Sequence, residues 1–136
     1  MLKTFELLND SEIVESIEIK DSRHLDDISY FKCVVILKDN SKLYINEFIS
    51  LTEINYSYHW QDKNDKMMYR WDNAPHHKNI ITFPHHVHIK NQILPYSYSR
   101  FEEILKKRRF YGKHPGFFYY SNHQTKSLLN NRYNLL

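Results

Sequence analysis

The sequence predicts one α+β domain spanning residues 1–136, in which an antiparallel sheet of about five or six strands packs against one main C-terminal helix. The first observation behind this prediction is size, because 136 residues with a hydrophobic fraction of 41% are enough for one domain and its core. The second is a series of segments in which apolar and polar residues alternate, as in half-buried strands. The third is a single strong helix start, at Ser99.

The first part of the chain predicts a hairpin preceded by one further strand. Residues 1–10 form a weakly helical or extended start, residues 13–20 alternate loosely as in a strand, and residues 21–29 are polar and predict a loop. Residues 31–38 are rich in β-branched side chains and apolar on both faces, which favours a central strand covered on both sides. After a polar turn, residues 43–49 predict the returning strand.

A second hairpin follows, with strands at residues 52–61 and 66–72. Alternation in its first strand predicts that the aromatic side chains are more buried than the polar ones. The aromatic set is Tyr56, Tyr58 and Trp60, and the polar set is Ser57, His59 and Gln61. If the hairpin closes symmetrically about its turn, Tyr58 faces Tyr69.

Residues 83–89 predict the last strand of the sheet. His86 and His88 share one face of this strand, because side chains two residues apart point the same way. Pro84 has no N–H group to donate to a neighbouring strand, so it marks an edge or the beginning of the strand.

The predicted C-terminal helix begins with a capping box, in which Ser99 is the N-cap and Glu102 bonds back to it. Gly112 and Pro115 are expected to end the helix. Residues 110–136 form an extra C-terminal segment, which is rich enough in apolar side chains to pack on the sheet or on another subunit.

The overall composition excludes several classes of protein. A net charge of +3 is too small to indicate a nucleic-acid-binding protein by itself, although residues 106–109 form one basic run. The single cysteine, Cys33, excludes an intramolecular disulfide and fits a reducing compartment. We find no apolar N-terminal signal and no long apolar run, so we expect a cytoplasmic protein without a membrane span.

Histidines are concentrated in one stretch, where residues 56–89 carry six of the nine in the chain. This density suggests either a metal site or acid–base chemistry. His86 and His88 have the spacing of metal ligands on a strand, and other side chains could complete a site. These side chains are Asp72, His59, His76 and His77. The stretch lacks cysteine ligands, so we expect no bound cofactor, with a divalent metal kept as the alternative.

Acid–base cleavage of RNA is the second interpretation, because histidine titrates near neutral pH and can act as base or acid. Our first candidates are His59 and His86 as acid and base, with Arg70 holding the phosphate. Further candidates are Asp72, which would orient a histidine, His77 and His88 as second choices, and Tyr58. The structural alternative is that these histidines only form hydrogen bonds to their neighbours on the sheet.

Three motifs in this stretch resemble the TumE toxin family: residues 56–61 (YSYHWQ), 70–77 (RWDNAPHH) and 83–89 (FPHHVHI). Their order and spacing make the resemblance specific, and it extends over residues 10–107. Residues 110–136 go beyond what the family is expected to have. The resemblance implies the toxin half of a two-gene system, with a protein antitoxin that is usually a DNA-binding helix-turn-helix protein.

The sequence and this resemblance together favour a toxin that cleaves RNA as a small endoribonuclease without a metal. The expected partners are an RNA substrate and the cognate antitoxin, and a homodimer is compatible with the sequence. The alternative function is a non-catalytic interaction protein, in which the histidine-rich stretch binds a partner or a structural metal.

Overall fold

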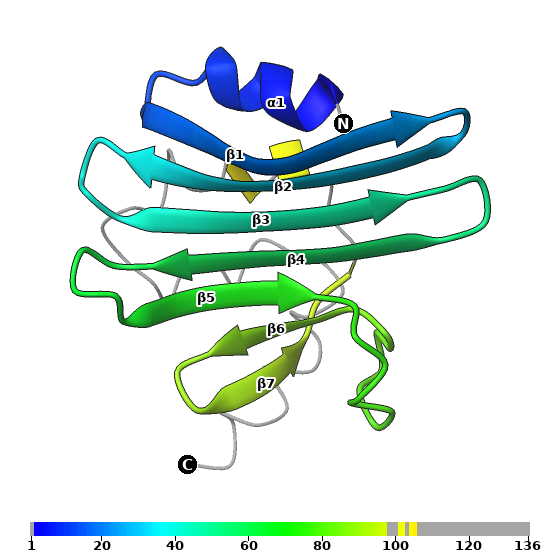
Figure 1. Cartoon of the computed structure of the whole chain (residues 1–136). Helices are drawn as coiled ribbons and strands as arrows, with labels where there is room; N and C mark the ends of the chain where they lie inside the picture. Colours follow the sequence, from blue (N-terminus) through cyan, green and yellow to red (C-terminus); the bar gives the residue numbers. More distant parts are fainter. Residues whose placement is uncertain (1, 98–100, 103, 106–136) are drawn as a thin grey trace.

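The computed structural model describes residues 2–97, 101, 102, 104 and 105, which form a seven-stranded antiparallel sheet with a helix at its N-terminal end (Figure 1). The strands follow one another across the sheet in sequence order, so each strand pairs with the next one in the chain. The elements are α1 (Leu2–Asn9), β1 (Val14–Leu25), β2 (Ile28–Leu37), β3 (Lys42–Ile49), β4 (Ile54–Gln61), β5 (Met67–Asp72), β6 (His86–Ile89) and β7 (Gln92–Pro95).

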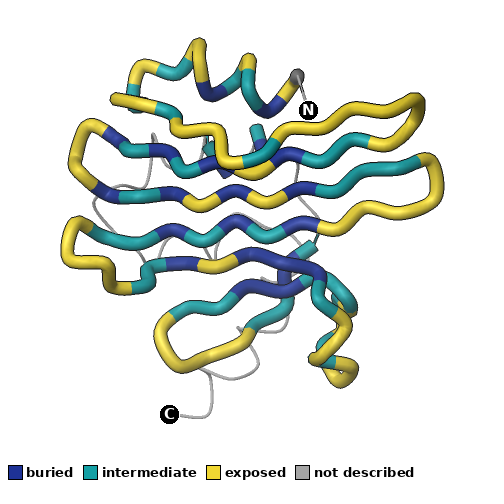
Figure 2. Tube along the Cα trace, in the orientation of Figure 1, coloured by how far each residue is buried: buried dark blue, intermediate teal, exposed yellow. Residues whose placement is uncertain are grey.

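One face of the sheet carries the hydrophobic core. Along the strands, buried residues alternate with more exposed ones, as Figure 2 shows most clearly for β2, β3 and β4. This pattern is typical of an antiparallel sheet with only one face covered. Leu8 of α1, together with Phe101 and Ile104, belongs to the same core as the buried face of the strands.

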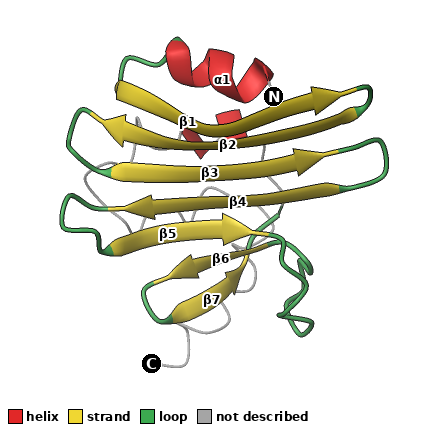
Figure 3. Cartoon of the chain, in the orientation of Figure 1, coloured by secondary structure: helices red, strands yellow, loops and turns green. Residues whose placement is uncertain are grey.

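The prediction of five or six strands is wrong, because the sequence did not indicate β7, and β1 is also longer than predicted (Figure 3). β1 continues through the predicted loop to Leu25, and the turn to β2 has Asp26 at a φ of 48°. Aspartate tolerates this left-handed conformation better than most residues. β7 is only four residues long and ends at Pro95, so its pattern was too short and too atypical to predict.

The prediction that the sheet packs against one main C-terminal helix is also wrong. The helix whose bounds the structure defines is α1, which has eight residues and therefore little periodicity to read from the sequence. Of the predicted helix, the described positions 101, 102, 104 and 105 are helical, while Ser99 and residues 110–136 lie outside the described residues. No helix in the described part of the chain is both long and apolar enough to cross a membrane.

The β4–β5 hairpin has the predicted faces but not the predicted register. Tyr58 pairs with Trp71 rather than with Tyr69, and the ladder contains a bulge between Trp60 and Gln61. The register therefore differs by two residues, and a shift of two keeps every side chain on its face. The predicted order of burial is confirmed. Tyr56, Tyr58 and Trp60 are 6%, 2% and 5% exposed, whereas Ser57, His59 and Gln61 are only partly buried.

Candidate functional site

The face of the sheet opposite the core carries a row of polar side chains that crosses four strands. Tyr44, His59, Arg70 and His88 lie directly opposite one another on β3, β4, β5 and β6, and we call them the polar row. Directly paired residues share a face of the sheet, so these side chains are neighbours. Arg70 and Tyr44 are exposed, and the rings of Tyr44 and His59 lie 5.9 Å apart between centroids.

Beside the polar row lies a group that we call the histidine cluster, made of Asp72, His77, His86 and His88. Asp72 on β5 pairs with His86 on β6, and both are almost fully buried, at 3% and 1% exposure. His77 reaches the cluster from the loop between these strands. Its ring packs edge-on against His86 at 4.7 Å and against His88 at 5.6 Å between centroids.

Asp72 is the common contact of this site. Its Oδ1 lies 3.0 Å from Nε2 of His86, and its Oδ2 lies 3.0 Å from Nε of Arg70 and 3.5 Å from Nε2 of His88. The backbone N–H of Ala74 donates a further hydrogen bond to Oδ1, at 3.0 Å. A buried carboxylate requires such partners, because an unpaired buried charge is costly. Asp72 therefore contacts Arg70 of the polar row as well as His86 and His88 of the histidine cluster.

His86 is fixed at both nitrogens of its ring. Nδ1 lies 2.8 Å from the carbonyl oxygen of Pro84, and Nε2 lies 3.1 Å from Nε2 of His88. The ring is thus held between the loop and the strand, and its Nε2 points into the cluster.

The surroundings of two histidines of the site lower their pKa values and so favour the neutral form of each ring. Burial, followed by the positive charge of Arg70, lowers the pKa of His59. Burial also lowers the pKa of His88, an effect that the charge of Asp72 opposes. His59 has a further unusual feature, because its Nε2 is buried and has no hydrogen-bond partner among the described residues. A buried polar atom without a partner is rare in proteins and is often found at functional sites.

The structure brings together most of the residues that the sequence singled out. Arg70, Asp72, His77, His86 and His88 are in direct contact with at least one other member, and His59 lies beside Arg70. Tyr58 is separate from them, because it lies on the core face and its hydroxyl donates a 2.6 Å hydrogen bond to Glu47. His76 is exposed in the loop.

Sequence reasoning missed three polar groups of the sheet. Tyr44 completes the polar row, but only the strand pairing reveals that it neighbours His59. Tyr56 and His85 are hydrogen-bonded on the other face, with 2.9 Å between the hydroxyl and Nδ1. Glu47 is buried, although the alternation of its strand could have placed it on the core face.

Glu47 gives a test of the core face that is independent of the histidines. We expect Glu47→Ala to lower the free energy of unfolding by about 1–3 kcal/mol, because the hydroxyls of Thr4 and Tyr58 both donate to this carboxylate and would lose their acceptor. Urea unfolding measures the change. Asn46→Ala, at the exposed neighbouring position, is the control and should stay within about 0.5 kcal/mol of the wild type. Equal losses for both variants would contradict this role of Glu47.

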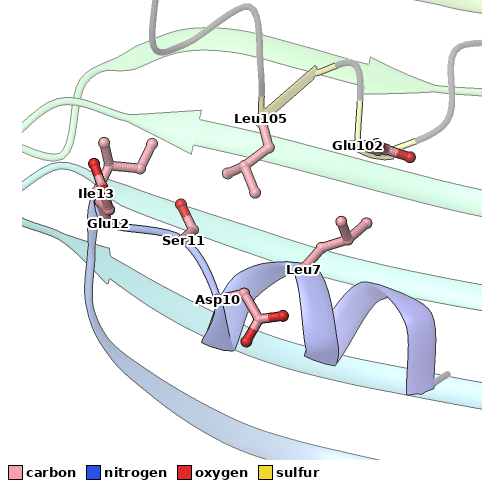
Figure 4. A pocket seen from close by; sticks show the side chains of 7 residues that line it. All are labelled: Leu7, Asp10, Ser11, Glu12, Ile13, Glu102 and Leu105. Atoms are coloured by element: carbon pink, nitrogen blue, oxygen red, sulfur yellow. The ribbon is translucent and has the colours of Figure 1, made fainter.

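A cavity of about 260 Å³ lies apart from the histidine cluster, next to the C-terminal end of α1 (Figure 4). It is lined by Leu7, Asp10, Ser11, Glu12, Ile13, Glu102 and Leu105. Three of these side chains are acidic and none is basic, which disfavours a phosphate-containing ligand. The polar row and the histidine cluster therefore remain the better candidate for chemistry on a nucleic acid.

The family model described as Toxin TumE matches residues 4–109. The match includes α1 from Thr4 onward, all seven strands and every residue of the polar row and the histidine cluster. No curated protein and no solved structure matches the chain.

Proposed function

The chain belongs to the TumE toxin family, and from this premise we propose that it is a small endoribonuclease that cleaves RNA by histidine acid–base chemistry. Membership of a toxin family indicates an antitoxin as its partner. We further propose that this antitoxin is a DNA-binding helix-turn-helix protein.

The polar row is the observation that carries the proposal. His59 lies on one side of Arg70, and His88, with the histidine cluster, lies on the other. Neighbouring strands are about 4.8 Å apart, so the two histidines are separated by roughly 10 Å with a cation between them. A phosphodiester bound at Arg70 would thus have a titratable group at each end, which is the arrangement that acid–base cleavage requires.

Arg70 would hold the phosphate. Its Nε contacts Asp72, and this contact holds a side chain that is otherwise 45% exposed. A guanidinium anchored in this way can donate to phosphate oxygens and offset the charge that develops on them.

His59 would act as the base that removes the proton of the ribose 2′-hydroxyl. Its lowered pKa keeps the ring neutral near pH 7, as a base must be before the reaction. The leaving 5′-oxygen would face the other side of Arg70 and take its proton from His88, whose protonated form the charge of Asp72 favours. Because His86 is buried, we assign it a positioning role rather than direct contact with RNA.

Tyr44 would provide the contact to a nucleobase. Its side chain is 38% exposed at the end of the row next to His59, so part of the ring is accessible to RNA. Stacking on an aromatic side chain is the common way in which proteins bind unpaired RNA bases.

The proposal is tested with the Arg70→Gln variant. We expect it to cut RNA about 10² to 10³ times more slowly than the wild type, which is the typical loss when one charge-stabilising donor is removed. The assay is cleavage of purified RNA with sequencing of the new ends, together with growth of a bacterial host that expresses the protein without its antitoxin. Arg23→Gln, at an exposed position of β1, is the matched control and should cut like the wild type.

The competing function is a non-catalytic interaction protein whose histidine-rich stretch binds a partner or a structural metal. The burial of Asp72 and His86 is the observation that favours it, because buried polar clusters often serve stability. A wild-type protein that arrests growth but produces no new RNA ends would support this function and contradict the endoribonuclease.

A further inference from the structure

We propose that His77, His86, His88 and Asp72 form a binding site for one transition-metal ion, with zinc as the preferred ion. One nitrogen from each of the three histidines lies within 4.8 Å of the other two. The sequence led us to expect no bound cofactor, because the stretch lacks cysteine ligands. The geometry of the folded cluster argues for the opposite.

The hydrogen bonds of His86 show which of its ring nitrogens faces the cluster. The carbonyl oxygen of Pro84 can only accept a hydrogen bond, so Nδ1 of His86 must carry the proton of their 2.8 Å contact. The other ring nitrogen, Nε2, lies 3.0 Å from Asp72 Oδ1 and 3.1 Å from His88 Nε2. Three acceptor atoms this close together need a cation among them, and either a shared proton or a metal ion can fill that place.

The spacing of these atoms fits a metal. Zinc binds imidazole nitrogens at about 2.0–2.1 Å, so two ligands of a tetrahedral site are roughly 3.3 Å apart. Within the cluster, the contacts of His86 with His88 and of Asp72 with these two histidines measure 3.1, 3.0 and 3.5 Å. His77 lies on the same side and is the ligand that the loop supplies.

The cluster also has the supporting contacts that metal sites use. Ligating histidines usually donate their other nitrogen to a carbonyl or a carboxylate, as Nδ1 of His86 does to Pro84. Ligating carboxylates are themselves hydrogen-bonded, and Asp72 is held by the Ala74 N–H and by Arg70. These contacts orient the ligands in advance.

The ligand types select the class of ion. Three imidazoles and one carboxylate suit zinc and related transition metals, whereas magnesium and calcium prefer ligand sets made of oxygen. No thiolate is involved, because the only cysteine, Cys33, is buried on the core face and burial raises its pKa to about 12. If Asp72 stays paired with Arg70, the three histidines leave one position open, as in catalytic rather than structural zinc sites.

The role of the ion rests on the proposed function, although its binding does not. The site lies on the side of Arg70 where we place the leaving oxygen of the RNA. A metal there would stabilise the negative charge of that oxygen as a Lewis acid, in place of a proton from His88. His59, across Arg70, would keep its role as the base.

The experiment measures metal binding to the untagged full chain. Protein stripped with a chelator and dialysed is titrated with zinc by calorimetry, and its metal content is then measured by elemental analysis. We expect one equivalent of zinc, and a visible absorption spectrum typical of four-coordinate cobalt when cobalt(II) replaces zinc. His77→Gln and His88→Gln should each weaken zinc binding at least about 10-fold. His76→Gln, the exposed neighbour in the same loop, is the matched control and should bind like the wild type.

Each outcome decides one point. Zinc content well below one equivalent, or equal affinities for the wild type and the two ligand variants, would overturn the metal site. The cobalt spectrum of the wild type tests the site even where a variant does not fold. Stoichiometric zinc without RNA cleavage would support the metal site and overturn the endoribonuclease. RNA cleavage by protein that binds no zinc would support the endoribonuclease and overturn the metal site.

Discussion

The His59→Gln variant is expected to lose RNA cleavage by a factor of about 10² to 10⁴ while its stability changes little. His59 lies on the polar face beside Arg70, and its Nε2 has no hydrogen-bond partner among the described residues. Removing the imidazole therefore breaks no hydrogen bond at that atom, but it removes the group that we assign as the base. Cleavage of purified RNA and urea unfolding of the same protein sample measure the two effects separately.

The pH dependence of cleavage gives a second readout of His59. Burial and the charge of Arg70 lower its folded-state pKa below the ordinary value of 6.5. A base with a lowered pKa stays neutral as the pH falls through 6.5, so the acidic limb of the wild-type rate profile should have its midpoint below that value. The limb should be absent from the residual activity of His59→Gln.

His24→Gln is the control for this substitution, because His24 is exposed near the end of β1 and belongs to neither the polar row nor the histidine cluster. It should cut RNA and arrest growth like the wild type. If His59→Gln folds normally and also cuts like the wild type, His59 is not the base and the acid–base assignment fails.

The sequence was sufficient to predict the faces of the central strands. Alternation has a period of two, so it assigned Tyr58 to the core face and His59 to the polar face without knowledge of the partner strand. A register error of two residues left these assignments intact. It could not give the register itself, because the bulge between Trp60 and Gln61 depends on how the turn closes.

The contacts of the histidine cluster could not be predicted in the same way. Periodicity shows that His86 and His88 share a face, but not that the loop folds back and places His77 against them. It also treats the polar face as exposed, whereas Asp72 and His86 are among the most buried polar residues of the described chain. A polar residue becomes buried only through tertiary contacts that satisfy it, and these contacts are not local in sequence.

His86→Ala is therefore expected to destabilise the protein strongly, by about 2–5 kcal/mol, which is the range for deleting a large buried side chain. The ring is 1% exposed, its Nδ1 contacts the carbonyl of Pro84, and its Nε2 faces the carboxylate of Asp72. Removal leaves a cavity and takes a partner from a buried charge, and both effects oppose folding. Urea unfolding in the presence of a chelator measures this loss separately from any contribution of a bound metal.

His76→Ala is the control, because it removes the same type of side chain from an exposed position in the adjoining loop. If burial is the cause of the loss, this variant should change the free energy of unfolding by no more than about 0.5 kcal/mol. A chain with the usual 5–15 kcal/mol of stability would lose a large fraction of it through His86→Ala. Loss of cleavage in that variant identifies a catalytic group only when the variant is folded under the assay conditions. If His86→Ala instead unfolds at the wild-type urea concentration and fails to cut RNA, His86 is not a structural anchor, and it acts in the chemistry as an acid, a base or a ligand of the proposed metal.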